Sequence, residues 1–126
     1  MVDILIVEDD EDILEILHIY LSVKYNVTIF DNPKLALEAY KINPNFPLVI
    51  TDYFMPDLRG DQLIHEILAI NENQQFILCS GTPNDEVASL LENNKNLIQF
   101  IKKPFDFSEF DDAIDVIEKK LLATHI

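Results

Sequence analysis

Short apolar runs alternate with amphipathic segments along the whole chain, and this alternation is what most limits how it can fold. Each run is short and rich in Ile, Leu, Val or Phe, as strands are. We predict strands at about residues 3–8, 26–30, 47–52, 75–80 and 97–101. The first, third and fourth runs are apolar on both faces, as expected of central strands covered on both sides. The pattern therefore predicts a parallel sheet.

The segments between these runs carry apolar residues at the three- to four-residue spacing of helices that face a core. The clearest stripes are Ile13, Ile16, Leu17, Tyr20 and Leu21, then Leu63, Ile64, Ile67 and Leu68, and finally Phe110, Ile114, Ile117 and Leu121. Strands that alternate with helices in this way require right-handed crossovers. We therefore expect an α/β fold, doubly wound, with helices on both faces of the sheet.

Capping residues indicate where several helices begin. Asn32-Pro33 suits a helix of about 33–42, and Thr82-Pro83 suits one of about 83–93, because each pair combines a capping side chain with proline at the first helical position. Ser108 resembles an N-terminal cap for the last helix. These residues predict the helix starts at three places.

Composition restricts the class of protein. A chain of 126 residues with 48% hydrophobic content suits a single domain across residues 1–126, with a core of about 2–122. Twenty-three acidic against nine basic residues give a net charge of −14, which opposes direct nucleic-acid binding. The lone Cys79 permits no intrachain disulfide, no signal-peptide pattern is present, and the apolar runs are too short to span a membrane. We expect a cytoplasmic protein.

Polar side chains stand at the C-terminal ends of four of the apolar runs. Glu8 and Asp9 follow the first run, Asp52 ends the third, Ser80 ends the fourth, and Lys103 follows the fifth. In an open parallel sheet, ligands bind at this edge. Three carboxylates in one pocket repel one another unless a cation neutralises them, and Mg²⁺ prefers such oxygen ligands together with a phosphate. The set predicts a site for Mg²⁺ and a phosphoryl group.

Four motifs around these residues resemble the response-regulator receiver domain of two-component signalling. They are Ile6-Val7-Glu8-Asp9-Asp10, Val49 to Asp57, Leu78-Cys79-Ser80-Gly81, and Phe100 to Phe105. The resemblance covers about residues 2–122, with the motifs in the family's order. It implies a flavodoxin-like (βα)5 fold with strand order 2-1-3-4-5. It also implies a signalling module that is no enzyme beyond catalysing its own phosphorylation and slow dephosphorylation.

The resemblance assigns roles to the acidic residues. Asp52 would be the phosphoacceptor, whose carboxylate attacks phosphorus and becomes an aspartyl phosphate. Asp9, Asp52 and the backbone carbonyl of Phe54 would bind Mg²⁺ directly, and Glu8 would act through water. Asp10 is open to a ligand role as well, but we favour it as the N-cap of the first helix, where a carboxylate is stabilising.

The resemblance also assigns the remaining polar residues and a switch. Lys103 would neutralise the phosphoryl oxygens, and a cis peptide bond before Pro104 would aim it into the pocket. Ser80 would donate its hydroxyl to the phosphoryl group and move together with Phe100. For Phe100, simple core packing is an equal alternative.

The phosphoryl donor would be a histidine kinase or a histidine phosphotransfer domain. Ile13 and Phe105 flank the pocket and would contact this donor, although core packing is equally open for Ile13. The output partner is not specified by the residues, and a phosphorylation-dependent dimer is one possible output. The resemblance implies that Phe54 and Thr82 flank the site at positions that influence loss of the phosphoryl group. Because Phe54 cannot hydrogen-bond an attacking water, we predict a relatively long-lived phosphorylated state.

Two other functions use similar residues. A phosphatase with an aspartate nucleophile would need a second catalytic aspartate two residues after Asp52, where Phe54 stands. A pseudo-receiver, a binding module that is not phosphorylated, would normally lack Asp52, Lys103 or the acidic pair, and all of these are present. Both alternatives are therefore disfavoured.

Overall fold

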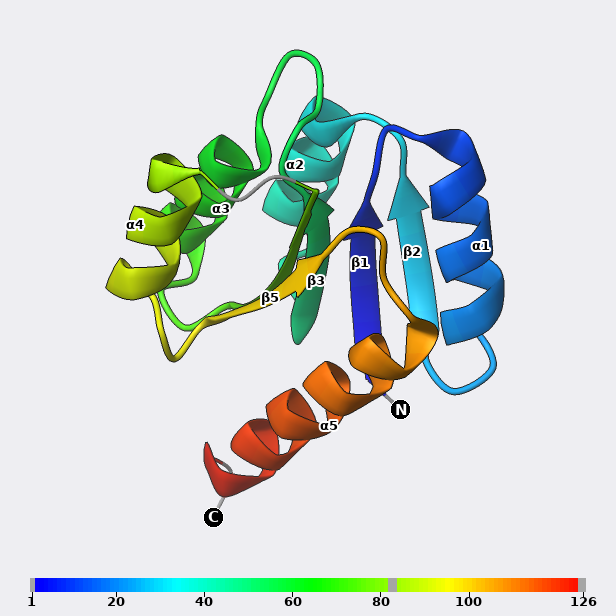
Figure 1. The fold of residues 1–126 in the computed structure, drawn as a ribbon. Helices are drawn as coiled ribbons and strands as arrows, with labels where there is room; N and C mark the ends of the chain where they lie inside the picture. The colour runs from blue at the N-terminus through cyan, green and yellow to red at the C-terminus, as the bar shows by residue number, and fades with distance from the viewer. Residues whose placement is uncertain (1, 82–83, 125–126) are drawn as a thin grey trace.

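The computed structural model describes residues 2–81 and 84–124, which form a five-stranded sheet with helices on both faces (Figure 1). The strands are β1 (Asp3–Val7), β2 (Asn26–Phe30), β3 (Leu48–Asp52), β4 (Gln75–Ser80) and β5 (Ile98–Lys102). The helices are α1 (Glu11–Leu21), α2 (Pro33–Ile42), α3 (Gly60–Ile70), α4 (Asp85–Asn93) and α5 (Phe107–Thr124). The predicted alternation of strands and helices is confirmed, and each strand end lies within one residue of its prediction.

All strand pairs are parallel, and the strand order is β2-β1-β3-β4-β5, as predicted. The predicted central strands β1, β3 and β4 are almost entirely buried. The register pairs Asp52 with Cys79 and Ser80 with Lys102. The carboxyl ends of β3, β4 and β5 therefore meet at one edge of the sheet, and the loops that follow them share a single crevice.

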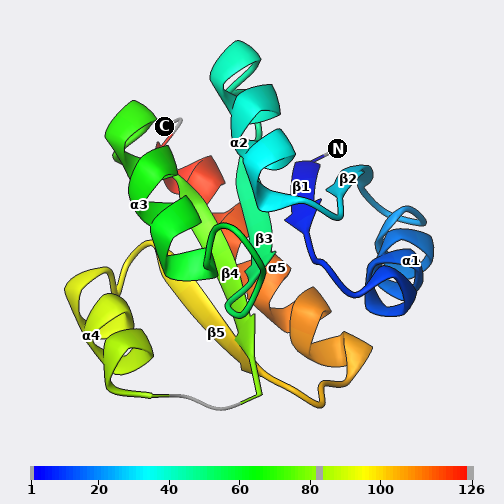
Figure 2. The same ribbon diagram turned by 90° about the horizontal axis from the view of Figure 1, so that it is seen from above.

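The sheet separates two hydrophobic cores, because side chains of one strand alternate between its faces. Helices α2, α3 and α4 cover one face, and α1 and α5 cover the other (Figure 2). The first core is centred on side chains such as Tyr40, Ile64 and Phe76, and the second on residues such as Leu17 and Phe110. Burial on both faces holds the edge that carries the polar residues in a fixed geometry.

Two predicted helix starts are confirmed by their caps. The Asp10 carboxylate accepts hydrogen bonds from the amides of Asp12 and Ile13, at 3.0 and 3.2 Å, so it caps α1 as favoured above. Asn32 caps α2, whose first residue is Pro33. The acceptor at each end satisfies amides that have no partner within the helix.

Two other predicted starts are wrong. Helix α4 begins at Asp85 rather than at 83, and Asn84 is its cap, accepting from the Val87 amide at 2.9 Å. The proposed cap pair Thr82-Pro83 lies outside the described residues. Helix α5 begins at Phe107, which places Ser108 inside its first turn. The residue before the helix is Asp106, whose amide donates to the Glu109 carboxylate at 3.0 Å, the reach-back contact of a capping box.

Candidate phosphoryl and magnesium site

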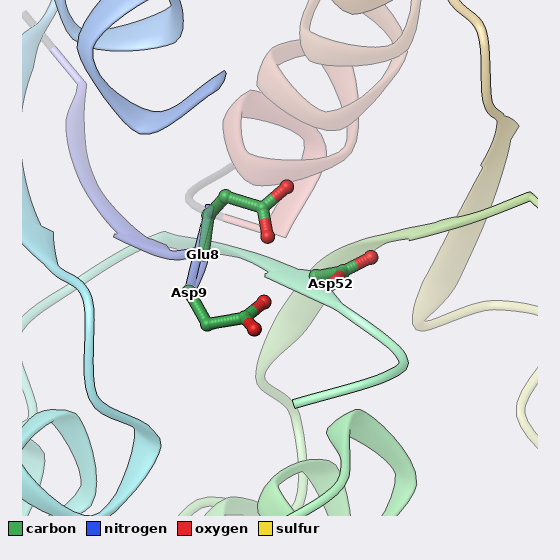
Figure 3. A group of neighbouring side chains, drawn as sticks. All are labelled: Glu8, Asp9 and Asp52. Carbon is green, nitrogen blue, oxygen red and sulfur yellow. The ribbon is translucent and has the colours of Figure 1, made fainter. Parts of the chain in front are cut away.

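Three carboxylates gather at the carboxyl edge of the sheet (Figure 3). Glu8 and Asp9 directly follow β1, and Asp52 is the last residue of β3. One oxygen from each lies within 4.8 Å of the others. Glu8 is 3% and Asp52 8% exposed, whereas Asp9 is the most exposed of the three. The neighbouring strands β1 and β3 thus bring together the acidic residues predicted to share a pocket.

Lys103 supplies the opposite charge to this pocket. Its Nζ lies 2.8 Å from Glu8 Oε1 and 3.0 Å from Asp52 Oδ1. Its amide donates to the Ser80 carbonyl at 2.9 Å, which fixes the loop after β5 against β4. The Lys103–Pro104 peptide bond is cis, as the resemblance implied. The preceding Lys102 is exposed, because adjacent residues of a strand face opposite directions.

Burial and charge shift the pKa values of two groups here. Burial raises the pKa of the Glu8 carboxyl to about 7; the Lys103 hydrogen bond opposes the shift, and the nearby Asp52 charge adds to it. Burial alone would lower the pKa of Lys103, but the hydrogen bonds to Glu8 and Asp52 outweigh it, so its pKa is raised. Perturbed pKa values of this kind are typical of functional sites, where burial and charged neighbours act on the same groups.

The donor set fits Mg²⁺. Three carboxylates face a single ammonium group, so the pocket holds excess negative charge and offers only hard oxygen ligands. Among residues 2–81 and 84–124, one group of three or more His, Cys, Asp or Glu side chains could share a single metal ion. Glu8, Asp9 and Asp52 form this group. The Phe54 side chain is 54% exposed and packs edge-on against the ring of Tyr53. That the backbone carbonyl of Phe54 binds Mg²⁺ remains a prediction.

The two residues predicted to form a switch lie on neighbouring strands. Ser80 ends β4 and is 1% exposed. Phe100 lies in β5, is partly buried, and packs against the core beneath α2, α3 and α4. The β4–β5 register pairs Ser80 with Lys102 and Leu78 with Phe100, so the two residues are one diagonal step apart. Their positions allow contact between a pocket residue and the outer strand of the sheet.

The residues predicted to contact a donor line an apolar cavity of about 490 Å³ beside the pocket. Its lining consists of Ile13, Ile16, Lys103, Pro104, Phe105 and Phe107. Both Ile13 and Phe105 are partly buried and pack on the core between α1 and α5. Ile13 thus packs on the core, which was one of the two readings offered for it, and it also lines the cavity, whereas its contact with a donor stays a prediction.

One residue of the site region was missed by the sequence analysis. Tyr53 follows Asp52, is 1% exposed, and donates its hydroxyl to the Glu86 carboxylate at the start of α4, at 2.9 Å. A polar aromatic residue directly after Asp52 was the available signal. Its acceptor lies 33 residues later in a turn of mainly exposed residues, and no local pattern connects the two.

The chain is similar in sequence and in fold to several known proteins. Residues 4–115 match the family model described as the response regulator receiver domain. The chain is 32% identical over 118 residues to the transcriptional regulatory protein KdpE of Staphylococcus aureus, covering 92% of this chain and 49% of that protein. A receiver domain structure from Clostridium thermocellum has a TM-score of 0.85 and 25% identity, covering 97% of this chain and 99% of that one.

A second structure, the non-phosphorylated HemR receiver domain of Leptospira biflexa, has a TM-score of 0.82 and 28% identity, covering 93% of this chain and 94% of that one. The chain spans less than half the length of each of three curated relatives that it matches, between 17% and 49%. In the part of the chain that the structure describes, no helix is both long and apolar enough to cross a membrane.

Proposed function

This chain belongs to the response-regulator receiver family of two-component signalling, and we propose that it accepts a phosphoryl group on Asp52 from a phosphohistidine. Receiver domains are signalling modules that bind Mg²⁺ at an acidic pocket and interact with histidine kinases or phosphotransfer domains. The observation that carries the proposal is the Lys103 ammonium group placed between Glu8 and Asp52 in a buried acidic pocket.

The chemistry assigned to Asp52 is nucleophilic attack. A carboxylate oxygen forms a bond to phosphorus, the phosphorus–nitrogen bond of the donor breaks, and the leaving imidazole nitrogen takes up a proton. The product is an acyl phosphate on Asp52. Such transfers need little covalent work from the protein, because positioning and charge neutralisation supply most of the acceleration.

The surrounding residues supply that neutralisation. Lys103 is held beside Asp52 by its bond to Glu8, so its ammonium group is already close to where phosphoryl oxygens would arrive. Glu8, Asp9, Asp52 and the Phe54 carbonyl would hold Mg²⁺, with Glu8 acting through water. When bound, Mg²⁺ would offset the charge of the carboxylates and of the incoming phosphoryl group.

The donor partner would be a histidine kinase or a histidine phosphotransfer domain, docked at the apolar cavity that Ile13 and Phe105 line. This cavity adjoins Lys103, so a partner seated there would present its phosphohistidine near Asp52. We propose that residues 1–126 form one receiver domain acting in the cytoplasm, without direct contact to nucleic acid or membrane. The choice of its output partner, and the formation of a phosphorylation-dependent dimer, would be decided by surfaces of the domain other than the pocket.

The proposed response is a two-state change. Ser80 would donate its hydroxyl to the phosphoryl group, and Phe100 on the neighbouring strand would turn inward, altering the face formed by α4, β5 and α5. A switch of this kind needs different contacts in the two states. When beryllofluoride and Mg²⁺ are added, the backbone amide chemical shifts should change at residues as far from the pocket as Phe100. Changes confined to the neighbourhood of Asp52 would reject the switch.

Phosphorylation is tested with phosphoramidate, whose phosphorus–nitrogen bond imitates phosphohistidine, by intact-protein mass spectrometry with and without Mg²⁺. The wild type is expected to gain one phosphoryl group only with Mg²⁺, and Asp52→Asn none. Asp57→Asn is the matched control, since Asp57 is an exposed aspartate of the loop that follows Asp52, with a φ of 70°, which asparagine also tolerates. Equal labelling of Asp52→Asn and the wild type would overturn the proposal.

A further inference from the structure

Tyr53 connects the proposed phosphoacceptor to three other elements. Its amide donates to the Cys79 carbonyl in β4 at 2.9 Å, and its carbonyl accepts from the Gly60 amide at the start of α3 at 2.8 Å. Its hydroxyl donates to the Glu86 carboxylate in the first turn of α4 at 2.9 Å. Every polar group of this residue is therefore bonded to a different segment.

The ring of Tyr53 has little freedom to move independently of Asp52. It is 1% exposed, and it lies within the core formed with α2, α3 and α4. On the helix side, Gly60 leaves no slack, since even a Cβ there would lie 2.9 Å from the Tyr53 Cα. Packed groups of this kind transmit displacements rather than absorbing them. A shift of the Asp52 backbone would consequently move the Tyr53 hydroxyl.

Helix α4 is well placed to follow that movement, because little else anchors it. Val87 is its one fully buried residue within the described chain, and Leu90 and Leu91 are only partly buried. Most of its remaining residues are exposed. For a helix packed through so few side chains, a hydrogen bond from a buried tyrosine to a carboxylate is a substantial part of what sets its position.

We propose that Tyr53 is a positioning residue that conveys the state of the Asp52 pocket to α4 through its hydrogen bond to Glu86. This inference rests on the proposed function, since it requires a pocket that changes state. It is separate from the route through Ser80 and Phe100, which ends on β5. The receiver would thus have two mechanical outputs, one toward β5 and one toward α4.

The test compares backbone amide shift changes caused by beryllofluoride with Mg²⁺ in four variants. Tyr53→Phe removes the donor and Glu86→Ala removes the acceptor, and because Glu86 is exposed its replacement should not prevent folding. Glu86→Gln keeps an acceptor oxygen without the charge and should behave like the wild type. Tyr40→Phe is the matched control, because it removes another buried tyrosine hydroxyl bond, to Gln74, without touching α4.

The proposal predicts that α4 amides lose most of their response in Tyr53→Phe and Glu86→Ala, while the responses near Asp52 and Phe100 persist. In Glu86→Gln and Tyr40→Phe the α4 response should be retained. An α4 response in Tyr53→Phe and Glu86→Ala as large as in the wild type would overturn the role of Tyr53. If the wild type itself shows no response anywhere, the phosphoacceptor proposal fails instead, so the two failures are distinguishable.

Discussion

Replacing Gly60 with alanine adds a methyl group where the first turn of α3 touches the end of β3. The new Cβ would lie 2.2 Å from the Asp52 carbonyl oxygen and 2.9 Å from the Tyr53 Cα. Both are backbone atoms, so no flexible side chain can yield. The Gly60 amide also donates to the Tyr53 carbonyl at 2.8 Å, which holds the two segments at this separation. The helix would have to retreat, or the strand end would have to bend.

The expected cost follows from the size of this overlap. A retreat of roughly 1 Å is needed to reach ordinary contact, which places the substitution at the upper end of the overpacking range, about 3 kcal/mol. Without the clash, the substitution would increase the free energy of unfolding. Gly→Ala at a compatible site stabilises a protein by about 0.4–1 kcal/mol, because alanine lowers the conformational entropy of the unfolded chain. Gly60 does not have a positive φ, so backbone strain does not enter.

Urea unfolding of the wild type, Gly60→Ala and Gly81→Ala measures the effect. Gly81 is the matched control, because among residues 2–81 and 84–124 a Cβ there would meet only the Lys103 Cβ, at 3.9 Å, an ordinary contact. We expect Gly60→Ala to lose about 3 kcal/mol of unfolding free energy and Gly81→Ala to stay within about 0.5 kcal/mol of the wild type. Equal stability of the two variants would refute the argument from close packing at the end of β3.

Three further predictions concern other residues. Tyr40→Phe leaves the buried Gln74 oxygen without its hydroxyl donor and should cost about 1–3 kcal/mol of unfolding free energy; an unchanged urea midpoint would contradict this. The Cys79 thiol is 3% exposed and should resist a thiol reagent until urea unfolds the protein; rapid labelling of the native protein would show the burial to be wrong. Phe54→Asn places a hydrogen-bonding side chain near Asp52 and should shorten the phosphorylated lifetime, whereas equal or slower decay in the variant would reject that role for Phe54. Thr82, for which the same tuning role was predicted, lies outside the described residues.

The sheet and its polar edge could be predicted because their signals are local. An apolar run of five or six residues predicts a buried strand, and the carboxyl ends of parallel strands lie at the same edge of the sheet. Those two facts place Glu8, Asp9 and Asp52 at one edge, and the strand order implied by the family resemblance makes β1 and β3 neighbours, which brings the three carboxylates close together. No knowledge of side-chain conformation is needed for that step.

The helix starts that were mispredicted show the limit of local chemistry. Asn84 caps α4 and Asp106 precedes α5, each two residues from the residue favoured by sequence, Thr82 and Ser108. All four residue types are good caps, and their intrinsic preferences differ too little to choose among close neighbours. Tertiary packing decides where the helix can begin, for instance by requiring Val87 to reach the core.

The pairings across the site could not be predicted for a different reason. Lys103 bonds to Glu8 across 95 residues, and Tyr53 bonds to Glu86 across 33. The sequence predicts that Lys103 lies in the pocket and neutralises a phosphoryl group, but it does not predict the ion pair of Lys103 with Glu8. Such contacts depend on the path of loops and on rotamers chosen by packing, which leave no periodic trace in the sequence.

The most direct test of the central claim is to locate the phosphoryl group chemically. Borohydride reduces an aspartyl phosphate to homoserine, so the protein is treated with phosphoramidate and Mg²⁺, reduced, digested and sequenced by mass spectrometry. We predict homoserine at position 52 and at no other aspartate. Homoserine at Asp9 or Asp57, with residue 52 recovered as unmodified aspartate, would contradict it.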